Sequence, residues 1–482
     1  MMALQILVGL LQVPLALKYL GNEGYGLWAL AFQVSLWLQL MDLGMNGALA
    51  RYLIDYRHDL SGRELAKCIG CGLRIFTAQG LVVTLATAAL AFTGEATFGL
   101  APGEALAFRN VLLILSTSAL IRFLPKVASA WLYASQRQDL IQIVFIVVTT
   151  LEFCLFWALL VTGNGIYAFA WSRAVTPIVA AGLFFWLAIR YADFPTQHLL
   201  AKSDLPMFRR LAGFAGGMFL LTLGNQLLTM SQTILASKVL GLTAAAVWAT
   251  APRLFQLVSQ AVGKLWDLRI PYLSLLMATS ERQYLTAQFI RTYRATAYIG
   301  GGAAGFVAAI NPEFLSLWTK GAISWEGGND LMMALGLYTV LLIRCFTDFV
   351  LHTKKVGWMP FLMLVEGFFF IGLSLVLLPS MGIRGMVLAS LLIGGLLRLP
   401  YAWVKFRQFC QLSNAGHGVL LLHSGGGLVL GVSLWWFLQV VSSRVPGHSQ
   451  ILELCVSSAI TSLVLLPIAW RLVLSNRDNQ QS

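Results

Sequence analysis

The sequence has few charged residues: Asp, Glu, Lys and Arg together make up 11% of its 482 positions. A soluble globular chain carries about 25%, so this chain has about half the usual means of keeping a surface hydrated. A charge content this low, combined with a hydrophobic fraction of 58%, excludes intrinsic disorder and argues against a large soluble enzyme. A polytopic membrane protein is the class that remains.

Cysteine is also scarce, with six in the whole chain. Cys68 and Cys71 have the spacing of a metal-binding pair, but no second pair or nearby histidine completes a site. We interpret them as a chance pair at the start of a helix, and we expect neither a metal nor another cofactor. The first apolar run lacks a preceding basic segment and a small-residue cleavage site, so no cleavable signal peptide is expected.

Long apolar stretches are abundant instead. A helix needs about 20 apolar residues to cross the hydrocarbon core, and the sequence predicts an all-α fold with about 14 such helices. Their expected ranges are 1–17, 25–50, 68–92, 108–133, 140–162, 166–189, 211–236, 243–263, 292–310, 329–352, 357–378, 384–403, 417–441 and 450–470.

Lys and Arg are distributed unevenly between the loops. The loops that follow even-numbered helices hold 20 of them, and the opposite side holds six, namely Lys18, Arg109, Lys238, Lys320, Arg384 and Arg444. Because cytoplasmic loops carry the excess of Lys and Arg, both termini are expected in the cytoplasm. The net charge of +13 is then mostly a topology signal, and it does not predict a nucleic-acid partner.

Two short motifs recur at nearly equal distances along the chain. The first motif, Leu20-Gly21 with Trp28, recurs 220 residues later as Leu240-Gly241 with Trp248. The second, Gly165-Ile166, recurs 217 residues later as Gly382-Ile383. These echoes indicate duplication of a six-helix unit, which gives two lobes that cross the membrane in the same sense. We expect an N-terminal lobe over 1–210, a C-terminal lobe over 211–410, and two extra helices with a short tail over 411–482.

Several cations fall inside the expected helices: Arg122, Lys126, Arg173, Arg253, Arg344 and Arg398. An arginine at a lipid-facing helix centre costs about 2.5–3.5 kcal/mol, so most of them are expected to face a protein interior or a water-filled cavity. The acids counted within the membrane are only three, namely Glu152, Asp348 and Glu366. The surplus of positive charge predicts an anionic substrate group, and guanidinium forks suit phosphate.

Internal ion pairing is the alternative for some of these residues. Arg344 and Asp348 are four residues apart and can pair on one helix face, and Arg398 can snorkel toward the inner surface. Arg122 and Arg253 are expected to lie deepest. The three acids either couple transport to protons or another cation, or they are structural partners of the arginines. Prolines also lie close to four of the arginines, at Pro125, Pro177, Pro252 and Pro400, and a proline frees a helix carbonyl, which is tolerated beside a cavity.

Three sequence segments resemble the Wzx-type polysaccharide flippases of the multidrug/oligosaccharidyl-lipid/polysaccharide exporter superfamily. They are residues 18–28 (KYLGNEGYGLW), Asp42-Leu43-Gly44 with Arg51, and residues 131–137 (WLYASQR) at the end of a stretch that begins at Arg122. Gly382-Ile383-Arg384-Gly385 also resembles the start of the twelfth helix of that family. The resemblance implies a MATE-like fold in the bacterial inner membrane. It also implies a flippase that moves an undecaprenyl-pyrophosphate-linked oligosaccharide to the periplasmic leaflet by alternating access.

The same resemblance implies how the substrate is held and which partners are involved. A cationic cavity between the lobes would hold the pyrophosphate and sugar, and the extra helices would accommodate the lipid tail. From the charges in the expected helices, our own hypothesis assigns Arg122, Arg253 and Arg173 to anion binding, supported by Lys126, Arg344 and Arg398. The implied partners are the lipid-linked oligosaccharide, membrane lipids, a polysaccharide polymerase and other assembly proteins that make surface polysaccharides such as O-antigen. One departure is that family members usually carry a cytoplasmic lead, whereas here the apolar run begins at Met1.

Other function classes fit the sequence less well. A cation-coupled multidrug efflux antiporter of the same fold would favour an acidic cavity, whereas we count three acids within the membrane, Glu152, Asp348 and Glu366, against the five arginines named above. A membrane polymerase, ligase or glycosyltransferase would carry a long outer loop, and the longest expected outer loops are only 93–107 and 311–328. The sequence has no Gly-rich phosphate loop for an ATP-driven pump, and the asymmetric lobes argue against an ion channel. We therefore expect a flippase and not an enzyme.

Overall fold

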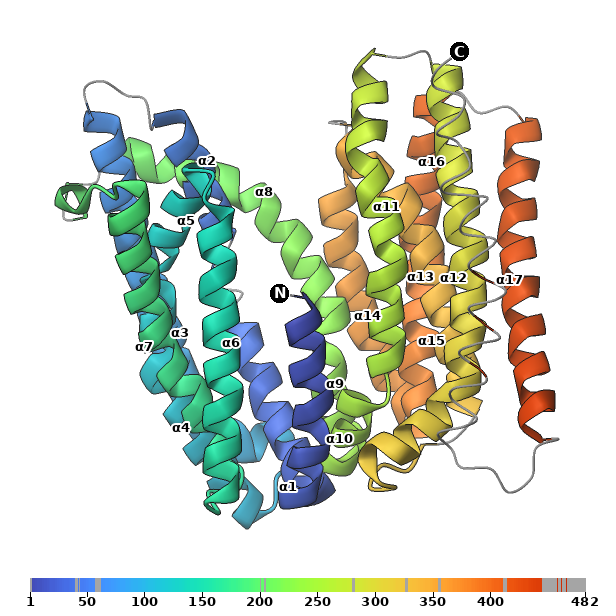
Figure 1. Ribbon diagram of the computed structural model, residues 1–482, viewed down its shortest axis with the longest axis horizontal. Helices are drawn as coiled ribbons and strands as arrows, with labels where there is room; N and C mark the ends of the chain where they lie inside the picture. Colours follow the sequence, from blue (N-terminus) through green and yellow to red (C-terminus); the bar gives the residue numbers. More distant parts are fainter. Residues whose placement is uncertain are drawn as a thin grey trace. The chain divides into compact units, whose positions relative to one another are not determined.

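In the computed structural model the chain is helical almost throughout (Figure 1). The structure describes residues 2–443 apart from 40–41, 43, 57–61, 200, 203–204, 280–281, 326–327, 354–356 and 411–413, and beyond 443 only residues 457, 461 and 465. No strand occurs in this part, and eight of its helices are long and apolar enough to cross a membrane. The expected class, an all-α polytopic membrane protein, is confirmed. The helix expected at 450–470 lies almost wholly outside the described residues.

The first compact unit spans Met1–Ala246. Its helices are α1 (Met2–Gln39), α2 (Met45–Tyr56), α3 (Arg63–Phe98), α4 (Pro102–Phe123), α5 (Lys126–Ala134), α6 (Gln138–Val161), α7 (Tyr167–Ala192), α8 (Leu205–Thr229), α9 (Ser231–Leu240) and the first half of α10 (Leu242–Thr250). Within it α8 packs on α2 and α3, and α9 packs on α1. The unit therefore extends past residue 210, and the expected lobe ranges, which were based on the repeat, stay a prediction.

The second compact unit spans Val247–Ser482. Its helices after α10 are α11 (Arg253–Thr279), α12 (Arg282–Thr319), α13 (Gly328–His352), α14 (Met359–Met381), α15 (Ile383–Ile393), the π-helical η3 (Gly394–Arg398), α16 (Leu399–Cys410) and α17 (Asn414–Ser443). The helix α17 is the first of the two extra helices expected from the sequence, and it lies beside α12 (Figure 1).

Several expected helices are interrupted in the structure. The range 108–133 is divided into α4 and α5 at residues 124–125, and the range 243–263 into α10 and α11 at residues 251–252. Pro125 and Pro252 lie at these two interruptions and cannot donate a backbone hydrogen bond to the preceding turn. The range 25–50 is divided between α1 and α2, and 384–403 contains the π-helical turn η3. Discontinuous helices of this kind form the binding sites of many transporters.

The two repeated motifs share their backbone geometry. Gly21 (φ 67°, ψ −178°) makes a corner inside α1, and Gly241 (φ 90°, ψ 177°) makes a matching corner between α9 and α10. Gly165 and Gly382 also both have positive φ, and each carbonyl accepts a hydrogen bond from the residue three positions later. A side chain at positive φ is strained, so glycine is required at each corner, as duplicates of one ancestral unit would be expected to require it.

Candidate substrate site

Arg122 joins α4 to α7 in the first unit. Its Nη2 donates a 2.9 Å hydrogen bond to the backbone carbonyl of Arg173. That carbonyl would normally accept from the N–H four residues later, but position 177 is a proline inside α7 and has no N–H to give. Arg122 therefore satisfies a carbonyl that Pro177 leaves free. A guanidinium has five N–H donors, and this is the one protein bond that Arg122 forms among the described residues.

Arg173 is held on three sides. Its Nη2 lies 3.1 Å from Oε1 of Glu152 on α6, and its Cζ lies 4.0 Å from the ring centroid of Phe32 and 5.9 Å from that of Trp28. The Trp28 ring, from the first repeated motif, in turn stacks on Phe169 at 4.5 Å. Carboxylate and aromatic faces both stabilise a cation in a partly buried setting, so the charge of Arg173 is matched within the unit.

Lys126 begins α5 and pairs with an acid at the interruption between α1 and α2. Its Nζ lies 3.1 Å from Oδ1 of Asp42 and 4.2 Å from the Phe123 ring centroid. Asp42 was missing from the three acids counted within the membrane, although it lies inside the expected range 25–50. The sequence feature that could have indicated a helix end near Asp42 is Gly44, which has a positive φ of 72° in the structure, after the end of α1.

Arg344 of α13 belongs to an ion network in the second unit. It lies 2.5 Å from Asp267 on α11 and 3.0 Å from Asp348 on its own helix, and Lys264 lies 3.1 Å from Asp267. Gly263 leaves room for the Arg344 guanidinium, which a Cβ at that position would contact. The network has two cations and two acids and is neutral. Asp267 was missed because α11 continues beyond residue 263, where the expected helix ended.

Arg398 pairs with Glu366 inside the second unit. Its Nε donates a 2.7 Å bond to Oε2 of Glu366, which is 2% exposed. Arg398 is the last residue of η3, and such π-helical turns are frequent at functional sites. The snorkelling that the sequence allowed for Arg398 is not what the structure has.

Two of the expected substrate-binding cations remain without an acid. Arg122 is partly buried, and Arg253 is exposed as the first residue of α11, directly after the interruption at Pro252. Neither forms an ion pair in the described part of the chain. The general surplus expected from the sequence is therefore reduced to these two arginines, because Asp42 and Asp267 neutralise charges that had been counted as unmatched.

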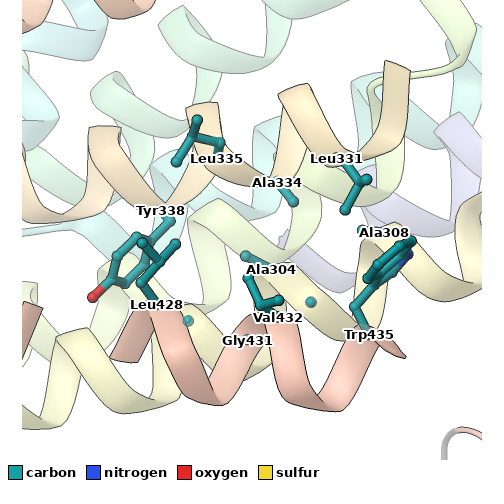
Figure 2. Close-up of a pocket in the computed structure, with 12 residues that line it drawn as sticks. Ala304, Ala308, Leu331, Ala334, Leu335, Tyr338, Leu428, Gly431, Val432 and Trp435 are labelled. Carbon is teal, nitrogen blue, oxygen red and sulfur yellow. The ribbon is translucent and has the colours of Figure 1, made fainter. Parts of the chain in front are cut away.

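An apolar pocket of about 300 Å³ lies between α12, α13 and α17 in the second unit (Figure 2). Leu331, Leu335, Leu428, Val432 and Trp435 line it together with glycines and alanines. The hydroxyl of Tyr338 at one end donates to the backbone carbonyl of Ser424 at 2.7 Å, so it has a partner already. The lining offers contacts to a hydrocarbon group and no free charge.

Along one side of this pocket, α12 and α17 contact each other through backbone atoms. Gly301 and Gly305 on α12 face Gly427 and Gly431 on α17 so closely that a Cβ on Gly301 or Gly305 would collide with a carbonyl of the other helix. Small residues four apart allow this close approach in membrane helices.

Solved transporter structures have the same fold. The chain matches the inward-facing conformation of a multidrug resistance MATE family transporter of the MOP superfamily with a TM-score of 0.71 at 13% identity, over 85% of this chain and 96% of that one. It matches the lipid II flippase MurJ in an inward closed conformation with a TM-score of 0.67 at 14% identity, over 97% of each chain. At these identities the similarity shows the fold alone.

The family is shown by sequence. No curated protein matches the chain in a sequence comparison. The family model described as polysaccharide biosynthesis protein matches residues 1–277, which is more than half of the chain and includes Arg122, Arg173 and Arg253. The chain belongs to this polysaccharide biosynthesis protein family and has the fold of multi-pass membrane transporters.

Proposed function

We propose that the chain is a flippase for an undecaprenyl-pyrophosphate-linked oligosaccharide, which it moves from the cytoplasmic to the periplasmic leaflet by alternating access. The observation that carries the proposal is Arg122, a guanidinium in a membrane-spanning segment without a carboxylate partner among the described residues. A family of polysaccharide biosynthesis and a fold shared with a lipid II flippase support a lipid-linked sugar as the cargo.

Arg122 suits a phosphate for a geometric reason. One N–H is fixed on the Arg173 carbonyl, so the guanidinium is oriented before a ligand arrives, and its other donors can form a fork with two phosphate oxygens. Arg253 is the second proposed anion-binding residue. Arg173, Lys126, Arg344 and Arg398 are proposed as supporting charges, each with its own carboxylate.

The acids first considered for ion coupling all hold cations. Glu152, Asp348 and Glu366 bind Arg173, Arg344 and Arg398 respectively. These contacts favour the structural alternative, and coupling through the three acids stays a prediction.

The apolar pocket beside α17 is proposed to receive part of the isoprenoid tail. Its volume is at the lower end of the range for ligand pockets, which is about 300–1,000 Å³. A tail that remains in an apolar environment while the phosphates remain paired avoids exposing charge to lipid. We place the protein in the bacterial inner membrane with both termini in the cytoplasm. The proposed partners are a polysaccharide polymerase and other assembly proteins, for a glycan such as O-antigen.

The test replaces Arg122 in a strain that lacks the chromosomal gene. Arg122→Ala is expected to reduce surface polysaccharide at least tenfold at matched membrane levels of the protein, and Arg122→Lys to recover part of it, because lysine keeps the charge and loses the fork. The control is Arg51→Ala, since Arg51 forms an exposed pair with Asp55 at 3.7 Å.

Two results would contradict the proposal. Export that is unchanged by Arg122→Ala, or that falls only in proportion to the amount of folded protein, would remove Arg122 from substrate binding. Resistance to cationic dyes on expression, without accumulation of cytoplasmic lipid-linked oligosaccharide in the knockout, would support the drug antiporter instead.

A further inference from the structure

A buried carboxyl without a cationic partner lies where α12 meets the start of α13. Asp330 is 1% exposed, and its Oδ1 accepts hydrogen bonds from Nδ2 of Asn311 at 2.7 Å and from Nε1 of Trp325 at 2.9 Å. Glu366, the other acid among the described residues that is buried to a similar degree, has Arg398 as its counter-ion. Asp330 forms no ion pair in the described part of the chain.

Asp330 and Asn311 each have one side-chain oxygen without a hydrogen-bond partner. Oδ2 of Asp330 and Oδ1 of Asn311 are inaccessible to solvent and have no hydrogen-bond partner, and Asn311 itself is 0% exposed. Two acceptors cannot satisfy each other. A proton on Asp330 would turn one of its oxygens into a donor, which is the kind of group that the orphan Asn311 oxygen lacks. An unsatisfied buried polar group costs about 1–3 kcal/mol.

The surrounding charges favour the neutral carboxyl as well. From α12, the Glu313 carboxylate acts on Asp330 and opposes a second negative charge. From α15, the cation Arg384 is engaged by Oδ1 of Asn329 at 2.7 Å, on the residue before Asp330. No group of three or more His, Cys, Asp or Glu able to hold a metal ion occurs in the described residues.

The pair also borders the apolar pocket. Leu331 follows Asp330 directly and Ala308 lies one turn before Asn311, and both line the same end of the pocket beside Trp435 (Figure 2). A change at the pair is therefore transmitted to the α12–α13 wall of the pocket by residues within one helical turn.

We propose that Asp330 and Asn311 form a proton-binding site that couples transport to protons. With the proton bound, the acid–amide pair joins α12 to α13. On its release the carboxylate faces the orphan amide oxygen and the charge of Glu313, and the two helices separate at this end, which widens the pocket. The coupling role rests on the proposed flippase function, whereas proton binding at the pair does not.

The first experiment measures the proton itself. Infrared difference spectra of the full-length protein in nanodiscs at neutral pH are expected to contain a carboxylic-acid C=O band that is lost in Asp330→Asn and kept in Glu366→Gln. A band that persists in Asp330→Asn, or that disappears in Glu366→Gln instead, would overturn the assignment.

The second experiment measures the consequence for stability. An acid protonated in the folded state contributes stability that is lost as the pH rises through its folded titration. The wild-type Tm should therefore fall by several degrees as the pH rises from about 4, where an aspartate of the unfolded chain ionises, to the alkaline side of neutrality, and the Asp330→Asn Tm should not follow it. Replacing potassium chloride with sodium chloride should change the Tm of neither protein. A Tm that depends on sodium in the wild type but not in Asp330→Asn would mean that the site binds a metal cation and not a proton.

The third experiment separates this proposal from the proposed function. The assay uses proteoliposomes with a lipid-linked oligosaccharide and an internal pH dye. The wild type should move protons with the substrate, and the rate of proton movement should be at least tenfold lower in Asp330→Asn. Wild type that flips nothing would contradict the flippase proposal and leave the infrared result standing. Flipping with unchanged proton movement in Asp330→Asn would contradict coupling at Asp330 alone.

Discussion

Arg122 and Pro177 act on the same backbone carbonyl from two different helices. The proline removes the donor that Arg173 would otherwise have within α7, and the arginine supplies one from α4. The Arg122 guanidinium therefore has a structural role as well as the proposed role in substrate binding. Assays of Arg122 variants therefore need a separate measurement of folding.

A double-mutant cycle tests this shared carbonyl. Arg122→Ala leaves the Arg173 carbonyl unsatisfied, at a cost of about 1–3 kcal/mol, whereas Pro177→Ala restores an N–H that can bind it within α7. We expect Arg122→Ala to be about 1 kcal/mol less destabilising in the Pro177→Ala background, measured by thermal unfolding in detergent. Equal effects in both backgrounds would mean that the bond contributes nothing to stability.

The Arg398–Glu366 pair makes a second prediction. Removing one partner of a buried pair leaves an uncompensated charge and costs about 3–5 kcal/mol, whereas replacing both by apolar residues is often nearly neutral. Arg398→Met should therefore destabilise the protein more than Arg398→Met/Glu366→Met in unfolding measurements. Full export by the double variant would assign both residues a structural role, and export lost by the double variant despite restored stability would show that the pair takes part in transport, through Glu366 as a coupling acid or Arg398 as a supporting charge.

At the scale of elements, proline and glycine positions shape the helices around the charges. Pro125 and Pro252 interrupt helices that the hydropathy pattern predicts as continuous, and Arg122, Lys126 and Arg253 lie within three residues of these interruptions. A separate element contact, between α12 and α17, depends on glycines that let backbone touch backbone.

The close contact between α12 and α17 predicts that a side chain added at Gly305 destabilises the protein, whereas one added at Gly418 does not. Gly305→Leu places a Cβ against the Gly431 carbonyl and should cost at least about 1–3 kcal/mol through forced separation of α12 and α17. Gly418→Ala on α17 is the control, because a Cβ there meets open space and alanine favours a helix. A Tm for Gly305→Leu equal to that of the control would contradict the close packing.

At the scale of the whole molecule, the charge asymmetry of the loops predicts the orientation of each span. α7 (Tyr167–Ala192) separates the turn at Asn164, on the expected outer side, from Asp193, which begins the expected inner loop. Alkaline phosphatase fused after Asn164 should be active and after Asp193 inactive, with green fluorescent protein giving the converse. The same fusions after Phe98 and Arg137 should repeat the outer and inner results, and the reversed pattern would overturn the positive-inside assignment.

The sequence by itself determined the class, an all-α polytopic membrane protein, and a family resemblance that the comparison confirmed. Both follow from features carried along the chain: low charge, apolar runs and short local motifs. Even the repeat could be read from glycines, since positive φ at Gly21 and Gly241 is a local requirement.

Only the tertiary structure decided which charges are matched. Lys126 meets Asp42, and Arg344 meets Asp267, across helices that are distant in sequence. Asp330, inside an expected helix but outside the counted acids, shows its importance only through the orphan oxygen of Asn311. Hydropathy sums over neighbours in the chain, whereas neutralisation depends on neighbours in space, and this is why composition predicted a surplus of cations and the fold reduced it to Arg122 and Arg253.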